Sequence, residues 1–500
     1  MEVNMNKQEY LREIDRVIAE GKYKDNWQSL ADHPVPKWYS DAKFGIFIHW
    51  GVFSVPAYSY EWYPRHMYIQ GTHESEHHVK TYGTQDKFGY KDFIPMFKGE
   101  KFDAEKWLDL FERAGAKYIT PVGEHHDGFQ MYKSELSRWN AAEMGPCRDV
   151  LGELREAAEG RGIKFCTSSH RAEHWWYFNG GRKIENSDVN DPEYEDFYGP
   201  AVWVEEYSKP YSPATNSIIA PPPNEEFLDD WLARTCELVD KYRPGLIYFD
   251  WWIHNVAFKP YLKKFAAYYY NRADEWGVDV TINYKFNAFS YTSGVYDIER
   301  GQFSSISPRL WQNDTAIAKN SWGYTENNDY KTADSIICDL IDVVSKNGCL
   351  MLNVGPKSDG TITDEETAVL LEIGDWLRIN GEGIYGSTYW KTFGEGPTKI
   401  PEGSFQDTER GSFTPQDIRY TYKDGYVYAY VLACPDDGNV CLTEMKQAVN
   451  YDLDYTVKSM KLLGFEEGCF DWERTTDGLN IKLRDGVRSE HPICFKIEID

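Results

Sequence analysis

Short runs of consecutive hydrophobic residues recur along the first 390 residues of the chain. The runs are continuous rather than alternating, which is typical of parallel strands that are covered on both faces. They cover residues 44–50, 118–122, 163–167, 246–250, 280–284 and 350–354. This pattern predicts the strands of a parallel sheet.

Between these runs, hydrophobic residues have instead the three- and four-residue spacing of amphipathic helices. Asp103 is suited to cap the first such helix, and Thr363 forms a capping-box pattern with Glu366 at the start of the last one. The repetition of strand and helix indicates an α/β fold. It predicts a (β/α)8-like, TIM-type barrel over residues 1–390.

The period of the hydrophobic pattern changes after residue 390. Residues 391–415 are rich in Gly, Pro and polar residues, which is typical of a linker or loop. Alternating hydrophobic residues then surround the Asp-Gly pair at 424–425 and follow the pair at 477–478, and both are hairpin signals. We therefore expect residues 391–500 to form an antiparallel β-sandwich domain.

Two long stretches of the predicted barrel, near residues 51–101 and 171–224, show no clear periodicity. Loops of this length in a compact domain usually carry function. We therefore expect elaborated loops on one end of the barrel.

The composition bounds the function further. Hydrophobic residues make up 41% of the chain and charged residues 27%, which is enough for a sizeable core and excludes long disorder. The net charge of −26 repels phosphate backbones and anionic lipids, so neither a nucleic acid nor a membrane is an expected partner. The aromatic content is unusually high at 16%. Such residues either fill a core or form the flat faces of sugar-binding clefts.

The nine cysteines are scattered and odd in number, and no close Cys pair has the spacing of a zinc site. The N-terminal residues lack the hydrophobic region of a secretory signal, and no run approaches the length of a membrane span. These features favour a reduced, cytoplasmic protein, or a secreted one if a signal has been removed.

Polar and aromatic side chains are concentrated where the predicted strands end, which is where the reacting groups of a (β/α) barrel lie. Asp250 ends an apolar strand among aromatic neighbours. It is either the cap of a loop or a nucleophile held in a sugar-sized pocket. Glycoside hydrolysis requires a second carboxyl group, for which Glu299 and Glu61 are the candidates. Each could instead be solvated or ion-paired, with Arg300 the obvious partner of Glu299.

The adjacent residues His125 and His126 invite a metal-binding interpretation. Neighbouring histidines on a strand do not easily reach one ion, and the helical spacing of a zinc site is absent. Neutral imidazoles are better suited to hydrogen bonds with sugar hydroxyls. We therefore expect no metal and no organic cofactor.

Five segments, FGIFIHWG, HHDGF, LIYFD, SWGY and NGCLMLNVGPKSDGTITDEE, occur in this order between residues 37 and 390. Together they resemble α-L-fucosidases of glycoside hydrolase family 29. The resemblance implies a barrel followed by a β-sandwich. It also implies an exo-acting enzyme that hydrolyses terminal α-L-fucosyl linkages with retention, through a covalent fucosyl-enzyme. The implied partner is a fucosylated oligosaccharide or small fucoside, and a homo-oligomer is possible.

The resemblance also assigns residues. Asp250 matches the nucleophile of the family at the end of its fourth strand. The residues that match sugar-binding positions, or adjoin them within the family motifs, are His49, Trp50, His125, His126, Tyr248 and Trp322.

The acid/base position departs from part of the family. Many members carry Trp-Glu shortly before the SWGY segment and use that Glu as acid/base, whereas this chain has Trp311 and Gln312. Because a Gln amide cannot supply a proton at neutral pH, we expect Glu299 to have this role, with Glu61 as the alternative. The other Glu would bind the sugar or tune the pKa of its partner.

Two other functions remain open. One is a glycosidase for another deoxy or galacto-configured sugar. The other is a fucose-binding protein without catalysis, which Gln312 keeps under consideration.

Overall fold

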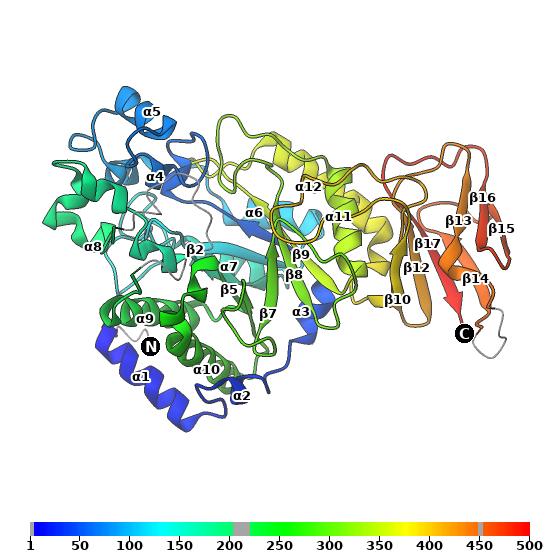
Figure 1. Ribbon diagram of the computed structural model, residues 1–500, viewed down its shortest axis with the longest axis horizontal. Helices are drawn as coiled ribbons and strands as arrows, with labels where there is room; N and C mark the ends of the chain where they lie inside the picture. The colour runs from blue at the N-terminus through cyan, green and yellow to red at the C-terminus, as the bar shows by residue number, and fades with distance from the viewer. Residues whose placement is uncertain (1–4, 204–220, 449–453) are drawn as a thin grey trace.

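The hydrophobic runs, together with two polar segments, form a closed barrel of parallel strands (Figure 1). The structure, a computed structural model, describes residues 5–203, 221–448 and 454–500. The strands are β1 (Phe44–Ile48), β2 (Tyr118–Glu124), β3 (Lys164–Phe165), β4 (Thr167–Ser169), β5 (Leu246–Phe249), β6 (Thr281–Tyr284), β7 (Val295–Glu299), β8 (Trp311–Ala316) and β9 (Gly348–Val354). β3 and β4 are one strand interrupted at Cys166, and β1 pairs with both β9 and β2, so eight strands close the barrel. The predicted fold class is confirmed.

The strands β7 and β8 are missing from the hydrophobic runs because several of their inward-facing side chains are polar. Gln312 donates a hydrogen bond of 2.8 Å to Asp297 and accepts one of 2.5 Å from the hydroxyl of Tyr39. All three side chains are buried inside the barrel. Because these polar groups bond one another, the strands tolerate residues that a hydrophobic pattern does not detect.

Helices cover most of the outer face of the barrel. They are α6 (Ala104–Arg113), α7 (Val150–Glu159), α9 (Glu225–Tyr242), α10 (Lys259–Trp276), α11 (Ala333–Ser345) and α12 (Asp364–Asn380). Asp103 caps α6 and Thr363 caps α12, as expected. The N-terminal helix α1 (Lys7–Glu20) packs against α9 and α10. The described connections 285–294 and 300–310, which flank β7, contain no helix.

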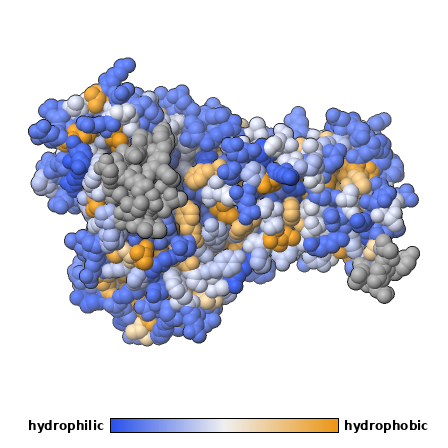
Figure 2. Space-filling model, in the orientation of Figure 1, coloured by the Kyte–Doolittle hydropathy of each residue, from blue (hydrophilic) through white to orange (hydrophobic). Residues whose placement is uncertain are grey.

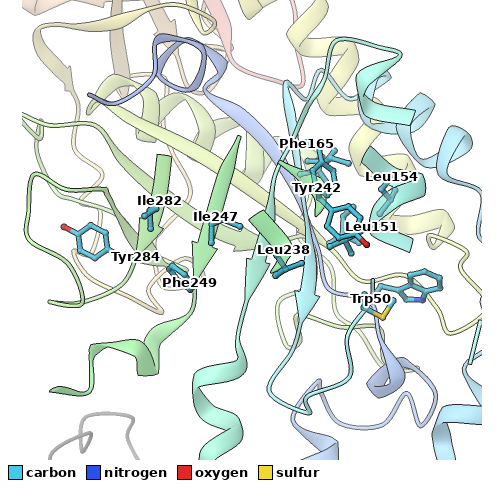
Figure 3. Close-up of a cluster of buried hydrophobic side chains, with 14 of the residues drawn as sticks. Trp50, Leu151, Leu154, Phe165, Leu238, Tyr242, Ile247, Phe249, Ile282 and Tyr284 are labelled. Atoms are coloured by element: carbon cyan, nitrogen blue, oxygen red, sulfur yellow. The ribbon is translucent and has the colours of Figure 1, made fainter. Parts of the chain in front are cut away.

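Side chains alternate between the two faces of the barrel wall. In β5, Ile247 and Phe249 point outward into the cluster that includes Leu238 of α9 (Figure 3), whereas Leu246 and Tyr248 belong to the core inside the barrel. This period of two follows from strand geometry. The residue after Phe249 is therefore directed into the mouth of the barrel.

The two long loops pack against each other at one end of the barrel, where α4 (Tyr63–His66), α5 (His73–Thr81) and α8 (Glu195–Tyr198) lie (Figure 1). Arg65 donates a 2.6 Å hydrogen bond to the carbonyl of Tyr177, and Tyr68 donates one of 2.9 Å to Asp188. Part of the second predicted loop, residues 204–220, lies outside the described residues.

The C-terminal part of the chain forms two antiparallel sheets that share one hydrophobic core. One sheet has the order β10 (Thr388–Glu395), β11 (Ile418–Lys423), β12 (Tyr426–Val431), β17 (Ile493–Ile499) and β14 (Val457–Leu462). The other has the order β13 (Asn439–Leu442), β16 (Leu479–Leu483) and β15 (Phe470–Arg474). Both predicted hairpins are present. The strand β10 begins before residue 391, so the first five residues expected to form a linker belong to this sheet.

The surface shown in Figure 2 is mainly hydrophilic, with small hydrophobic areas scattered over it. All nine cysteines lie within the described ranges, and each is a free thiol. Among the described residues, every helix falls short of the length and apolarity required to span a bilayer. Most large hydrophobic side chains of the described residues are buried, in clusters around the barrel, inside it and in the sandwich.

Buried ion pairs connect the barrel to the sandwich. Asp342 of α11 is fully buried and contacts Lys346 at 2.5 Å and the guanidinium of Arg419 in β11. Burial opposes ionisation of Asp342, but these two cations hold the pKa of its carboxyl below the usual value. The three charges are therefore interdependent.

We expect Asp342→Ala to destabilise the protein by about 3–5 kcal/mol, because it leaves two buried cations without their shared partner. The midpoint of urea unfolding measures this effect. Asp375→Ala is the matched control, since Asp375 forms an exposed 3.1 Å pair with Arg378 and its loss should cost less than about 0.5 kcal/mol. Equal, small effects of the two changes would contradict the assignment.

Candidate active site

A cavity of about 400 Å³ opens at the carboxyl ends of the barrel strands. Its polar walls come from the ends of consecutive strands. The side chains are His49 after β1, His125 and His126 after β2, His170 after β4, Asp250 after β5, Lys285 after β6, Glu299 of β7 and Asp314 of β8. Most of these positions continue the inward-facing alternation of their strand, which brings residues far apart in sequence to one place.

Lys285 is the central cation of this cavity. Its Nζ lies 3.1 Å from Asp250 Oδ1, 2.6 Å from Glu299 Oε2 and 3.5 Å from Asp314 Oδ2. The hydroxyl of Tyr248 donates a further hydrogen bond of 2.8 Å to Asp314. Only 4% of the Lys285 side chain is exposed. One positive charge is thus shared by three carboxyl groups, of which Asp250 and Asp314 are buried and Glu299 is partly buried.

The environment shifts the pKa values of the two strand-end carboxyl groups in opposite directions. Burial would raise the pKa of Asp250, but Lys285 and His170, which is 3.3 Å away, hold it well below the ordinary value. Burial raises the pKa of Glu299 to about 7, because the negative charges of Asp250 and Asp314 oppose the effect of Lys285. One carboxyl group is therefore ionised and the other is protonated in slightly acidic solution.

The spacing of this pair suits retention of configuration. Asp250 Oδ1 and Glu299 Oε2 contact the same ammonium, so their separation cannot exceed the sum of 3.1 and 2.6 Å. Retaining glycosidases hold their carboxyl groups about 5–5.5 Å apart, whereas inverting ones need about 6.5–9.5 Å. The shared ammonium keeps these two oxygens below the inverting range.

The four histidines differ in charge. Burial lowers the pKa of His49 and His125 well below the usual value, and it also lowers that of His170. Burial acts in the same sense on His126, but Glu173 at 3.2 Å and Asp250 at 3.6 Å raise its pKa to about 9. The expectation of neutral imidazoles therefore holds for His49 and His125 and is wrong for His126.

Two groups of side chains among the described residues could hold a metal ion. His49, His125 and His170 form one, and His126, His170 and Asp250 form the other, each with ligand atoms within 4.8 Å of one another. His49 is oriented by a 2.7 Å hydrogen bond between its Nδ1 and Asn353. This bond leaves Nε2 as the ring atom available to a ligand.

Glu61 lines the same cavity but has other partners. Its Oε2 accepts a hydrogen bond of 2.8 Å from the backbone N–H of Trp322 and one of 3.0 Å from the hydroxyl of Ser321. The carboxylate therefore fixes the backbone at Trp322. That indole ring also packs under the Arg300 guanidinium, at 4.7 Å.

The cavity contains all but one of the side chains predicted from the sequence. Trp50, expected to bind substrate, instead lies in the hydrophobic core, where its ring packs on Phe97, Phe102 and Trp107. The reason is the strand period, because adjacent residues point in opposite directions and His49 points into the cavity. Arg300 is not the partner of Glu299, since it pairs with Asp407 at 3.5 Å.

Gln312 does not line the cavity. It faces the barrel interior next to Tyr39, and Asp314, two residues further along β8, is the residue that reaches the cavity. The absence of a Glu at position 312 therefore leaves both carboxyl groups of the Asp250–Glu299 pair in place.

Two further residues that line the cavity also stand at the ends of predicted strands. Lys285 directly follows the predicted strand 280–284, and His170 follows the strand near 163–167, so both occupy strand-end positions. Phe405 also lines the cavity, but it belongs to the segment predicted as a linker. No periodic signal marks its position.

Two family models match the chain. The model described as Alpha-L-fucosidase matches residues 11–382, and that of the Alpha-L-fucosidase C-terminal domain matches residues 412–498. The chain belongs to the α-L-fucosidase family. It is therefore a glycoside hydrolase, and the family expected from the sequence motifs is confirmed.

Similar proteins support this membership over nearly the whole length. Tissue α-L-fucosidase of Homo sapiens is 31% identical over 501 residues, which cover 96% of this chain and 92% of the human one. α-L-Fucosidase of Dictyostelium discoideum is 29% identical over 506 residues, which cover 96% of this chain and 95% of its own. The crystal structure of Thermotoga maritima α-fucosidase has a TM-score of 0.72 and 28% identity, covering 95% of this chain and 100% of that chain. That fucosidase has also been crystallised with a mechanism-based inhibitor.

Replacing Lys285 tests its electrostatic role. In Lys285→Met, the pKa values of Asp250 and Glu299 should both rise, because the cation that lowers them is gone. We expect kcat/KM for an aryl α-L-fucoside to fall about 100-fold or more, and its basic limb to move to higher pH. In Lys285→Arg, which keeps the positive charge, the basic limb of kcat/KM should stay near its wild-type pH. An unshifted profile in Lys285→Met would contradict this role.

Proposed function

We propose that this member of the family is a retaining exo-α-L-fucosidase in which Asp250 is the nucleophile and Glu299 is the acid/base. The observation that carries the assignment is the Lys285 ammonium, which contacts both carboxyl groups at 3.1 and 2.6 Å. The opposite shifts of their pKa values supply one ionised and one protonated group, as a double displacement requires.

In the first step, the ionised Asp250 attacks the anomeric carbon of the fucosyl group while the bond to the leaving oxygen breaks. Glu299 donates its proton to that oxygen, so the leaving group departs as a neutral alcohol. A fucosyl ester of Asp250 results. In the second step, the Glu299 carboxylate removes a proton from water, the water oxygen attacks the anomeric carbon, and Asp250 is released. Two inversions give net retention.

Lys285 can stabilise the negative charge that is present in each step of this reaction. Before the attack, Asp250 is the charged partner and Glu299 is neutral. In the ester, Asp250 has lost its charge and Glu299 has gained one, at a distance of 2.6 Å from the same ammonium. The negative charge therefore moves between two oxygens that are already bound by one cation, and little reorganisation is needed.

The remaining walls suit a single sugar. His49 and His125, kept neutral by burial, can exchange hydrogen bonds with hydroxyl groups, and Trp322 offers a flat apolar face. Because the strand ends close the cavity at its base, a terminal sugar fits this arrangement better than an internal one. The geometry favours Glu299 over Glu61 as acid/base, since Glu61 Oε2 already accepts two hydrogen bonds that position Trp322.

A fucose-binding protein without catalysis is less well supported. Gln312 lies below the cavity, so its amide leaves both carboxyl groups of the Asp250–Glu299 pair in place. Small fucosides as substrates, an intracellular location and a homo-oligomer stay predictions.

Azide rescue distinguishes the roles of the three carboxyl groups. With an aryl α-L-fucoside, Glu299→Ala should lose about 10²–10⁴-fold in kcat, and azide should restore turnover by forming α-fucosyl azide from the intermediate. Asp250→Ala should instead yield β-fucosyl azide, because azide replaces the nucleophile and only one inversion occurs. Glu61→Ala should lose activity without any azide adduct. An α-azide adduct from Glu61→Ala alone would assign the acid/base to Glu61.

The pH dependence of kcat/KM reports the same two groups. Because the pKa of Glu299 is raised to about 7, its proton is present below that pH and is lost above it, so we expect kcat/KM to fall as pH rises through about 7. The low pKa of Asp250 keeps the nucleophile ionised well into acid. In Glu299→Gln the basic limb should disappear. A basic limb of unchanged position in Glu299→Gln would refute the assignment.

A further inference from the structure

A segment of the C-terminal part of the chain returns to the mouth of the barrel. Between β10 and β11, Gly403 forms a bridge with Gln302, and the N–H of Phe405 donates a 2.9 Å hydrogen bond to the carbonyl of Glu299. The N–H of Gln406 donates one of 2.8 Å to the carbonyl of Arg300. The family models end at residue 382 and resume at residue 412. The segment around Phe405 therefore lies between the two matched ranges, whereas the β7 end that it contacts lies within the first.

Buried ionic contacts hold the segment in place. Asp407 Oδ2 lies 2.5 Å from Lys331 Nζ, 2.7 Å from Thr315 Oγ1 and 3.5 Å from Arg300. Burial would raise the pKa of Asp407, but these cations keep it below the ordinary value, so the carboxylate stays charged. The backbone of Phe405 is thus held near Glu299 by its own hydrogen bond and by the contacts of Asp407, two residues further along the chain.

The side chain of Phe405 does not belong to the hydrophobic clusters of the barrel or the sandwich. It lines the active-site cavity and is 59% exposed, and its backbone has a left-handed φ of 59°. Phe286, which directly follows Lys285, lines the same cavity, is 47% exposed and has a φ of 52°. Bulky residues rarely adopt this conformation, and such strain is typically kept at functional sites. Two exposed rings are therefore presented at the cavity. The backbone of Phe405 bonds to Glu299, and Phe286 follows Lys285, which contacts the Glu299 carboxyl group.

We propose that Phe405, together with Phe286, forms the subsite for the leaving group and stacks on the apolar C–H face of the sugar to which fucose is linked. The inference rests on the proposed role of Glu299. The proton donor must lie beside the leaving oxygen, so the group attached to that oxygen lies beside Glu299, where both rings are exposed. Aromatic rings bind flat apolar faces with little loss of conformational freedom. Phe405 is thus a specificity-determining residue supplied by the connection between β10 and β11 of the C-terminal part of the chain.

The test compares substrates that share fucose and differ in leaving group. An α-L-fucosyl disaccharide presents a sugar ring, 4-nitrophenyl α-L-fucoside presents an aryl ring, and α-L-fucosyl fluoride presents neither. In Phe405→Ala, we expect the ratio of kcat/KM for either glycoside to that for the fluoride to fall about 5- to 10-fold. Phe405→Trp should restore the ratio. The Ala variant keeps the β-carbon and the backbone conformation of an exposed residue, so its folding should be intact.

Tyr291→Ala is the matched control, because Tyr291 is also an exposed aromatic residue, at 53%, but lines a different cavity. It should leave the ratio unchanged. A proportional loss on all three substrates, or a loss restricted to the aryl fucoside, would overturn the sugar-stacking subsite. Failure of the wild-type enzyme to hydrolyse the fluoride would instead refute the proposed fucosidase mechanism, so the two failures are distinguishable.

Discussion

The ammonium group of Lys285 lies among more carboxyl groups than one positive charge can keep ionised. Asp250, Glu299 and Asp314 all lie within 3.5 Å of it, and burial removes the water that would otherwise stabilise their charges. Two of these groups consequently differ in protonation. Lys285 and the neighbouring histidines lower the pKa of Asp250, whereas burial and the negative charges of Asp250 and Asp314 raise the pKa of Glu299. The chemistry proposed for the cavity depends on this imbalance.

The barrel makes such a cluster possible because it directs alternate residues of each strand inward. Below the cavity, the interior is partly polar, with Gln312 bonded to Asp297 and Tyr39. Above it, the same alternation places carboxyl groups and histidines around one space. The outer face is instead packed with hydrophobic side chains from strands and helices. The outer face of the barrel strands thus supplies hydrophobic packing, and the inner face supplies the reacting groups.

The C-terminal part of the chain contributes both to the stability of the barrel and to the lining of the cavity. Arg419 joins a buried charge cluster on α11 and so connects the sandwich to the barrel. The segment around Phe405 and Asp407 closes the side of the barrel near β7, where the described connections contain no helix. A missing helix in the barrel is thereby replaced by a segment that also reaches the cavity.

The sequence by itself determined the fold class, the family and the nucleophile candidate, because strand period, helix caps and ordered motifs are local signals. It also indicated Glu299 as the preferred acid/base candidate. Tertiary structure decided the rest, since burial and charge depend on residues that are distant in sequence. Only the folded chain places Lys285 between Asp250 and Glu299, turns Trp50 away from the cavity and charges His126. Phe405 could not be placed from its local sequence, because the backbone of another domain's strand end fixes its position.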